Sequence, residues 1–204
     1  MNIRLRYDTS FTAGVHWLDK LYMTNYNVNL KLLTNCIDSD AQNLAMYRVK
    51  SMITEHFTNS VFINQNEQKQ IKQYLSAGIK VTTIPEEPVD QVIGIMLFCK
   101  LNAVMEGRIL VSELELTSEL GDMIFYVHSE GETVGPFAED GWWNNPEPVH
   151  NDITRYIKRV NDERIVEMQK QLTWKDYGFQ WEPDDDSSES TVVYVDFPRK
   201  NENE

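Results

Sequence analysis

The sequence of 204 residues lacks the short motifs that most often reveal a catalytic function. It contains no G-x-x-x-x-G-K-[ST] phosphate loop, no G-x-G-x-x-G after a predicted strand, no G-x-S-x-G and no H-E-x-x-H. These absences remove the commonest nucleotide-binding and acyl-transfer architectures. The sequence therefore favours a protein that is not an enzyme, and it predicts no cofactor.

Cysteine is scarce as well, because Cys36 and Cys99 are the only two and no C-x-x-C pair occurs. Two isolated cysteines fit the reducing cytosol, where each packs as a small hydrophobic residue. The first residues, Met1 to Arg6, alternate like a strand and do not resemble a signal peptide. We therefore expect a cytoplasmic protein.

Basic residues are few: 19 Lys and Arg face 32 Asp and Glu, which gives a net charge of −13. This balance argues against direct binding to a nucleic-acid backbone, which needs clustered positive charge. An acidic mimic of nucleic acid that binds a host protein is one alternative function. However, many of the carboxylates fall in the tail from Glu182 to Glu204.

One long stretch, Glu86 to Tyr126, organises the rest of the chain. Pro88 and the two glutamates before it suit a helix start, and Gly107 suits a helix stop. The apolar run between them is about half of the ~20 residues that a membrane span needs. We predict a buried helix over 88–106, in which Lys100 and Asn102 need either solvent or a polar partner.

The predicted fold class is α+β, with a mixed or antiparallel sheet packed on this long central buried helix and with flanking helices. A single domain is expected over 1–183, followed by an acidic flexible segment over 184–204 that contains a candidate edge strand at 191–197 (TVVYVDF). Strands are predicted at 2–7, 28–33, 61–63, 79–84, 109–111, 114–116 and 123–127, and helices at 41–57, 64–77 and 152–172, while 11–26 is open to a short amphipathic helix.

The turn dipeptide Gly121-Asp122 predicts an antiparallel hairpin that ends with the strand 123–127. An aromatic loop follows this hairpin, with Phe137, Trp142 and Trp143 in the sequence GPFAEDGWWNNPEP. Adjacent residues on an extended segment point to opposite sides, so one tryptophan can anchor inward while the other faces a partner. The alternative is that both tryptophans cap the core. These three residues are the predicted binding site for a protein partner or ligand.

A second candidate site surrounds His128. Together with Glu130 and Glu132 it alternates along a strand end, and His150 would complete a metal site if the aromatic loop folded back. This set is the basis of an alternative function as a metal-dependent hydrolase or nuclease. The competing interpretation is a hydrated strand end that binds no metal.

The segments Asp90 to Leu97 and Lys100 to Ala103, with SELGDMIFYVHSE and GWW downstream, resemble a family of uncharacterised proteins from contractile-tailed bacteriophages, including marine ones. The resemblance covers Val28 to Trp143. It implies a phage-encoded protein of unknown function that acts in the cytoplasm of an infected bacterial host or in the virion. It brings no catalytic residues.

Together these observations predict a non-enzymatic protein-interaction or assembly module. It would bind a protein partner or associate with itself, and it would neither enter a membrane nor bind nucleic acid directly.

Overall fold

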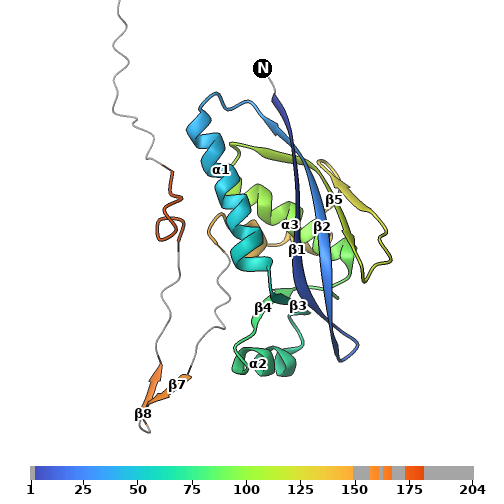
Figure 1. The fold of residues 1–204 in the computed structure, drawn as a ribbon, viewed down its shortest axis with the longest axis vertical. Coiled ribbons are helices and arrows are strands. Elements are labelled where there is room, and N and C mark those ends of the chain that lie inside the picture. Colours follow the sequence, from blue (N-terminus) through green and yellow to red (C-terminus); the bar gives the residue numbers. More distant parts are fainter. Residues whose placement is uncertain (1–2, 149–156, 161–162, 167–172, 182–204) are drawn as a thin grey trace, which may run out of the picture.

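The computed structural model describes residues 3–148, 157–160, 163–166 and 173–181. It has an α+β fold, with one six-stranded mixed sheet in the order β4-β3-β1-β2-β5-β6 (Figure 1). The β1–β3 and β3–β4 pairs are parallel, and the other pairs are antiparallel. The strands of this sheet are β1 (Ile3–Trp17), β2 (Lys20–Thr34), β3 (Ser60–Asn64), β4 (Lys80–Ile84), β5 (Leu110–Ser118) and β6 (Tyr126–Ser129).

The centre of the sheet is a long hairpin in which β1 and β2 pair from Ile3↔Thr34 to Trp17↔Lys20. Leu18 and Asp19 connect the strands with φ values of 49° and 59°, as a two-residue type I′ turn requires. The alternative of a short helix within 11–26 is therefore wrong. The turn lacks the usual Asn-Gly signal, which is why the sequence pattern left this region open.

Two helices, α1 (Ser39–Ser51) and α3 (Asp90–Met105), pack on the sheet and on each other. Asp38 caps α1, since its carboxylate accepts a hydrogen bond from the Asp40 N–H at 2.9 Å. The chain continues from α1 into a π-helical segment, Met52–Phe57. The prediction of one long central helix is not confirmed, because α1 and α3 share the covering of the sheet.

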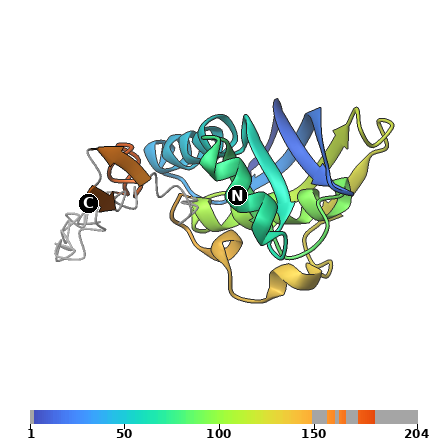
Figure 2. The ribbon, with the colours of Figure 1, turned by 90° about the horizontal axis from the view of Figure 1, so that it is seen from below.

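Helix α3 lies between the sheet and the loop of residues 135–148 (Figure 2). This position explains why the sequence of α3 is apolar almost all the way round. Ile93, Met96, Leu97, Leu101 and Val104 are all fully buried there. The third helix, α2 (Gln68–Ser76), connects the parallel strands β3 and β4 and buries Ile71. Within the described ranges, no helix has the length and apolar character that a membrane crossing requires.

The helix predicted over 152–172 is wrong where the structure describes this segment. Residues Ile157–Val160 and Glu163–Val166 form two antiparallel strands, β7 and β8. The segment is rich in β-branched residues, which favour strands, and its apolar spacing fits either structure. The predicted acidic segment 184–204 and its candidate strand 191–197 lie outside the described residues.

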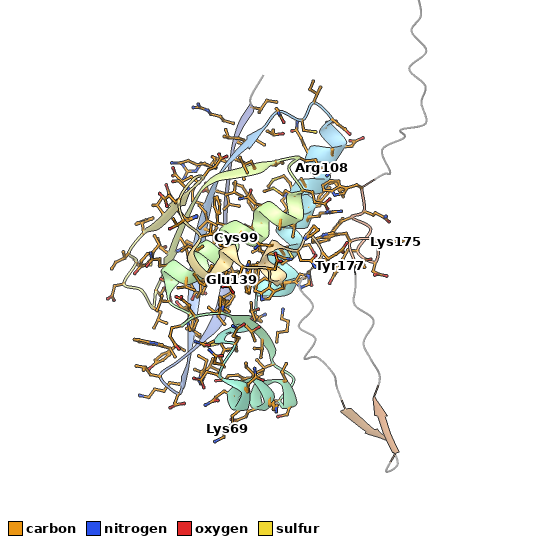
Figure 3. All side chains as sticks on the ribbon, turned by 180° about the vertical axis from the view of Figure 1, so that it is seen from behind. Lys69, Cys99, Arg108, Glu139, Lys175 and Tyr177 are labelled. Carbon is orange, nitrogen blue, oxygen red and sulfur yellow. The ribbon has the colours of Figure 1, made fainter. Side chains whose placement is uncertain are left out.

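Arg48 of α1 attaches residues 173–181 to the body of the protein. Its guanidinium is buried between the rings of Trp174 and Trp181, at 5.0 and 3.9 Å from their centroids. It donates to Phe179 O at 2.8 Å and to Val104 O at 3.2 Å. In Figure 3, Tyr177 lies toward the helices while Lys175 lies on the outer side of the segment.

We expect Arg48→Met to lower the free energy of unfolding by about 3–5 kcal/mol, because it leaves the Val104 and Phe179 carbonyl oxygens without their donor and the Glu106 carboxylate with Arg108 as its remaining cation. Urea denaturation followed by tryptophan fluorescence measures this change. The matched control is Arg6→Met, since Arg6 is exposed and pairs with exposed Asp8. A loss for Arg48→Met no larger than that of the control would contradict this account.

Candidate functional site

The aromatic loop over residues 135–148 is packed against the body of the protein. Phe137 is 1% exposed and Trp143 is 7% exposed, and their rings meet edge to face with centroids 5.3 Å apart. The Trp143 indole N–H donates to Phe137 O and to Glu139 O, at 3.1 and 3.0 Å. Two of the three predicted binding residues are therefore core residues of the loop itself.

Trp142 is the partly exposed member of the three. Its indole N–H donates to Thr83 O at 3.0 Å, which attaches the loop to strand β4. Its ring centroid lies 6.5 Å from that of Phe57, so the apolar part of the side chain packs inward. The structure thus gives Trp142 an intramolecular role, and its contact with a partner stays a prediction.

Lys100 of α3 is the residue that holds this loop in place. The side chain is fully buried, and its ammonium donates to Trp142 O at 3.0 Å, Asn145 O at 2.7 Å and Glu147 O at 2.6 Å. Burial lowers the pKa of Lys100 to about 7, against the opposing effect of the Glu147 carboxylate. The sequence-based expectation that Lys100 needs a polar partner is confirmed.

Asn102, the second polar residue flagged in α3, also has a partner. Its side-chain oxygen accepts from the Val111 N–H at 2.8 Å, and its amide donates to Val111 O at 3.4 Å. Asn102 therefore joins the end of the helix to the start of β5. Both polar residues of α3 therefore have hydrogen-bond partners within the fold.

His128 lies at the wall of a cavity of about 450 Å³ between α3, β5 and β6. Its ring is 7% exposed and packs edge to face on Phe98, with centroids 4.6 Å apart. Nδ1 lies 3.4 Å from the Glu132 carboxylate, whereas buried Nε2 has no hydrogen-bond partner among the described residues. The lining includes Gln91, Ile95, Leu114, Tyr126, His128, Glu132 and Thr133.

The predicted metal ligands are only partly brought together. His128 and Glu132 meet, but Glu130 is exposed and does not line the cavity. His150 lies outside the described residues. Across the part of the chain that the structure describes, no group of three or more His, Cys, Asp or Glu side chains is placed to hold a metal ion.

Sequence reasoning missed an apolar surface at the turn between β5 and β6. Five large apolar side chains in the segment Leu120–Val127 are between 41 and 68% exposed. So many exposed apolar side chains within eight residues are unusual on a protein surface. The apolar run Met123-Ile124-Phe125 could have revealed this surface, but the sequence pattern assigned these residues to a strand over 123–127. The exposed side chains are Leu120, Met123, Ile124, Phe125 and Val127.

Hydrogen bonds to Ser118 hold the same turn in place. The Ser118 hydroxyl donates to the buried Asp90 carboxylate at 2.6 Å and accepts from the Gly121 N–H at 2.9 Å. A Cβ atom at Gly121 would lie only 2.2 Å from Asp90 Oδ2, so a larger residue there would have to displace this carboxylate. Asp122 and Met123 then take φ values of 53° and 58°, which turn the chain outward.

No protein-family model matches the chain, and no curated protein matches it. Among solved structures, the fold is similar to uncharacterized protein WS1659 from Wolinella succinogenes, at 10% identity and a TM-score of 0.48, covering 64% of this chain and 99% of that one. It is also similar to 6-pyruvoyl tetrahydropterin synthases from Plasmodium vivax (13% identity, TM-score 0.39, 63% and 97% covered) and Plasmodium falciparum (12%, 0.40, 62% and 96%). Similarity at this level assigns neither a family nor an activity to the chain.

The buried ammonium of Lys100 leads to a prediction about pH. Its pKa is about 7 in the folded protein and roughly 10.4 in an unfolded chain, so the unfolded state binds one more proton between these values. The contribution of Lys100 to the free energy of unfolding therefore increases as the pH rises from 7 toward 10. Urea denaturation of wild type and Lys100→Met at pH 6, 7, 8 and 9 measures it.

We expect the free energy of unfolding of wild type minus that of Lys100→Met to increase above pH 7, by up to ~1.4 kcal/mol per pH unit. Lys69→Met is the matched control, because Lys69 is exposed on α2 (Figure 3). A difference that is constant or that shrinks with increasing pH would refute the lowered pKa of Lys100.

Proposed function

We propose that this protein is a non-enzymatic assembly module that joins copies of its own chain through strand β6 and the apolar segment Leu120–Val127. The observation that carries the proposal is the coincidence of two features. Five large apolar side chains are exposed in this segment, and β6 is the last strand of the sheet.

The open edge of β6 is suited to receive another strand. Among the described residues, no strand pairs with its outer edge. Natural proteins protect such edges with very short strands, lysine, proline, bulges or a covering loop. Strand β6 is itself short, with four residues. The β6 sequence Tyr-Val-His-Ser has neither lysine nor proline, and its pairing with β5 is regular.

The opposite edge of the sheet, β4, is protected in two of these ways. Pro85 follows the strand, and the Trp142 indole N–H donates to Thr83 O. The contrast between the two edges supports a directed contact at β6. The aromatic loop covers the β4 edge, so in our proposal it leaves β6 as the edge that a partner can bind.

The apolar segment would supply the binding energy of this contact. Complete burial of a fully exposed Val, Ile, Met or Phe side chain contributes about 1.5–3 kcal/mol, and these half-buried side chains would each contribute a part of that. Because Asp90, Ser118 and Gly121 fix the turn, little conformational entropy is lost when a partner covers it. A rigid apolar surface beside an unpaired strand fits β-strand addition better than it fits catalysis.

The phage origin that the sequence resemblance implies, and an action in the infected cytoplasm or the virion, stay predictions. So does the alternative of an acidic nucleic-acid mimic. An assembly module is compatible with a structural role in either setting.

Replacing Phe125→Ser and Val127→Lys together tests the proposal. Both side chains are more than half exposed, so the fold should tolerate the change, while the lysine blocks the edge and the serine removes apolar area. We expect wild type to sediment as an oligomer at micromolar to submillimolar concentrations and the double variant to sediment as a monomer. Sedimentation velocity over that range is the measurement.

The matched control is Ile37→Ser with Met23→Lys, which also removes two exposed apolar residues and adds one lysine. It should assemble like wild type. Wild-type protein that is monomeric throughout the range, or a control that dissociates equally, would overturn the proposal. Thermal melts within about 3 °C of wild type show that each variant is folded.

A further inference from the structure

We infer that the cavity beside His128 binds a small organic cation. The ammonium group of this ligand lies against the Glu132 carboxylate, and its apolar body lies between α3 and β5. The inference goes beyond the proposed function and requires no assembly of copies. Three features of the cavity support it: its size and apolar walls, the charge of its lining, and a glycine of α3 that leaves space in its wall.

The cavity has the size and the mixed lining of a small-molecule site. Its volume is about 450 Å³, and most ligand pockets measure roughly 300–1,000 Å³. Ile95 of α3, Leu114 of β5 and Tyr126 of β6 supply apolar surface. Gln91 and Thr133 add an amide and a hydroxyl. The cavity therefore suits a ligand with an apolar body and a small number of polar groups.

The charges of the lining favour a positively charged ligand. Among the described residues that line the cavity, Glu132 supplies the one carboxylate and none is Lys or Arg. The Glu132 side chain is 55% exposed, so an ammonium paired with it keeps part of its hydration. An anionic ligand would meet this carboxylate without a basic partner, which disfavours its binding.

His128 and Glu132 together leave acceptors for such a ligand. His128 Nδ1 lies 3.4 Å from one carboxylate oxygen of Glu132, and a carboxylate has about four acceptor positions, so others can accept from an ammonium. With Nδ1–H directed at Glu132, Nε2 of the neutral ring is an acceptor, and this buried nitrogen has no hydrogen-bond partner in the described part of the chain. A ligand donor that reaches Nε2 removes the cost of leaving it unpaired.

Gly94 leaves space in the cavity wall at a cost in helix stability. It lies inside α3, where glycine is less favourable than alanine. Packing does not require glycine there, because an added Cβ atom would lie 3.7 Å from Leu116 Cβ and 3.8 Å from Leu114 Cδ2, at ordinary contact distances. A function for the space beside Gly94 accounts for a residue that helix stability and packing do not explain.

The probe for the test is 2-phenylethylamine, a cation of about nine non-hydrogen atoms. We expect it to bind the full-length protein near pH 7 with a Kd of roughly 0.1–10 mM. The uncharged analogue 2-phenylethanol should bind about fivefold more weakly or worse, and the anion 3-phenylpropanoate should show no measurable binding. Saturation-transfer NMR titrations measure these affinities for assembled and unassembled chains alike.

Two variants locate the amine in the cavity. Glu132→Gln keeps the shape of the side chain and removes its charge, so it should weaken amine binding roughly 5–20-fold and leave the binding of 2-phenylethanol unchanged. Its matched control is Glu130→Gln, because Glu130 is exposed outside the cavity. Gly94→Ala should raise the melting temperature by about 1–4 °C and weaken amine binding about tenfold, because its methyl group occupies space in the cavity.

Other results would overturn the inference. The anion binding as tightly as the amine would show that Glu132 does not select the charge of the ligand. Amine binding that is unchanged in either Glu132→Gln or Gly94→Ala, or that weakens equally in Glu130→Gln, would place the amine elsewhere. So would the absence of amine binding at concentrations above the expected Kd. Sedimentation tests the assembly through β6 separately, so either proposal can fail while the other stands.

Discussion

The burial of one lysine is the constraint on which the arrangement around α3 depends. Lys100 places three N–H donors against three backbone carbonyls of the loop that carries Trp142 and Glu147. A buried ammonium is costly, and this geometry satisfies every donor that it has. The loop is thereby held over α3, which buries the helix on the side away from the sheet and positions the Trp142 indole against β4.

The two edges of the sheet differ because of this loop. Without the loop, β4 would present open backbone groups, as β6 does. With it, only the β6 side combines an unpaired edge with exposed apolar side chains, as far as the described residues show. Asymmetry between edges gives an assembly a direction, which a sheet with two equivalent edges lacks. The same lysine therefore stabilises the fold and, in our proposal, leaves one surface for partners.

Net charge opposes the assembly that we propose for the β6 edge. Copies with a charge of −13 repel one another at long range, and salt screens this repulsion over about 8–10 Å. Backbone pairing and apolar contact act only at short range. In our proposal, this balance limits contact between copies to surfaces that fit closely.

The sequence alone determined the local features of this protein. The cap at Asp38, the burial of α3, the hairpin of β5 and β6, and the need of Lys100 and Asn102 for partners were all predictable, because each depends on neighbouring residues or on helical spacing. The turn at Leu18 and Asp19, the strands β7 and β8, and the partners of Lys100 were not. The aromatic loop shows the limit: composition marked Trp142 and Trp143 as unusual, but only tertiary contacts decided that they face inward. Likewise, the apolar segment became a surface only when sheet order placed β6 at an edge, because strand neighbours are set by long-range pairing that no local pattern encodes.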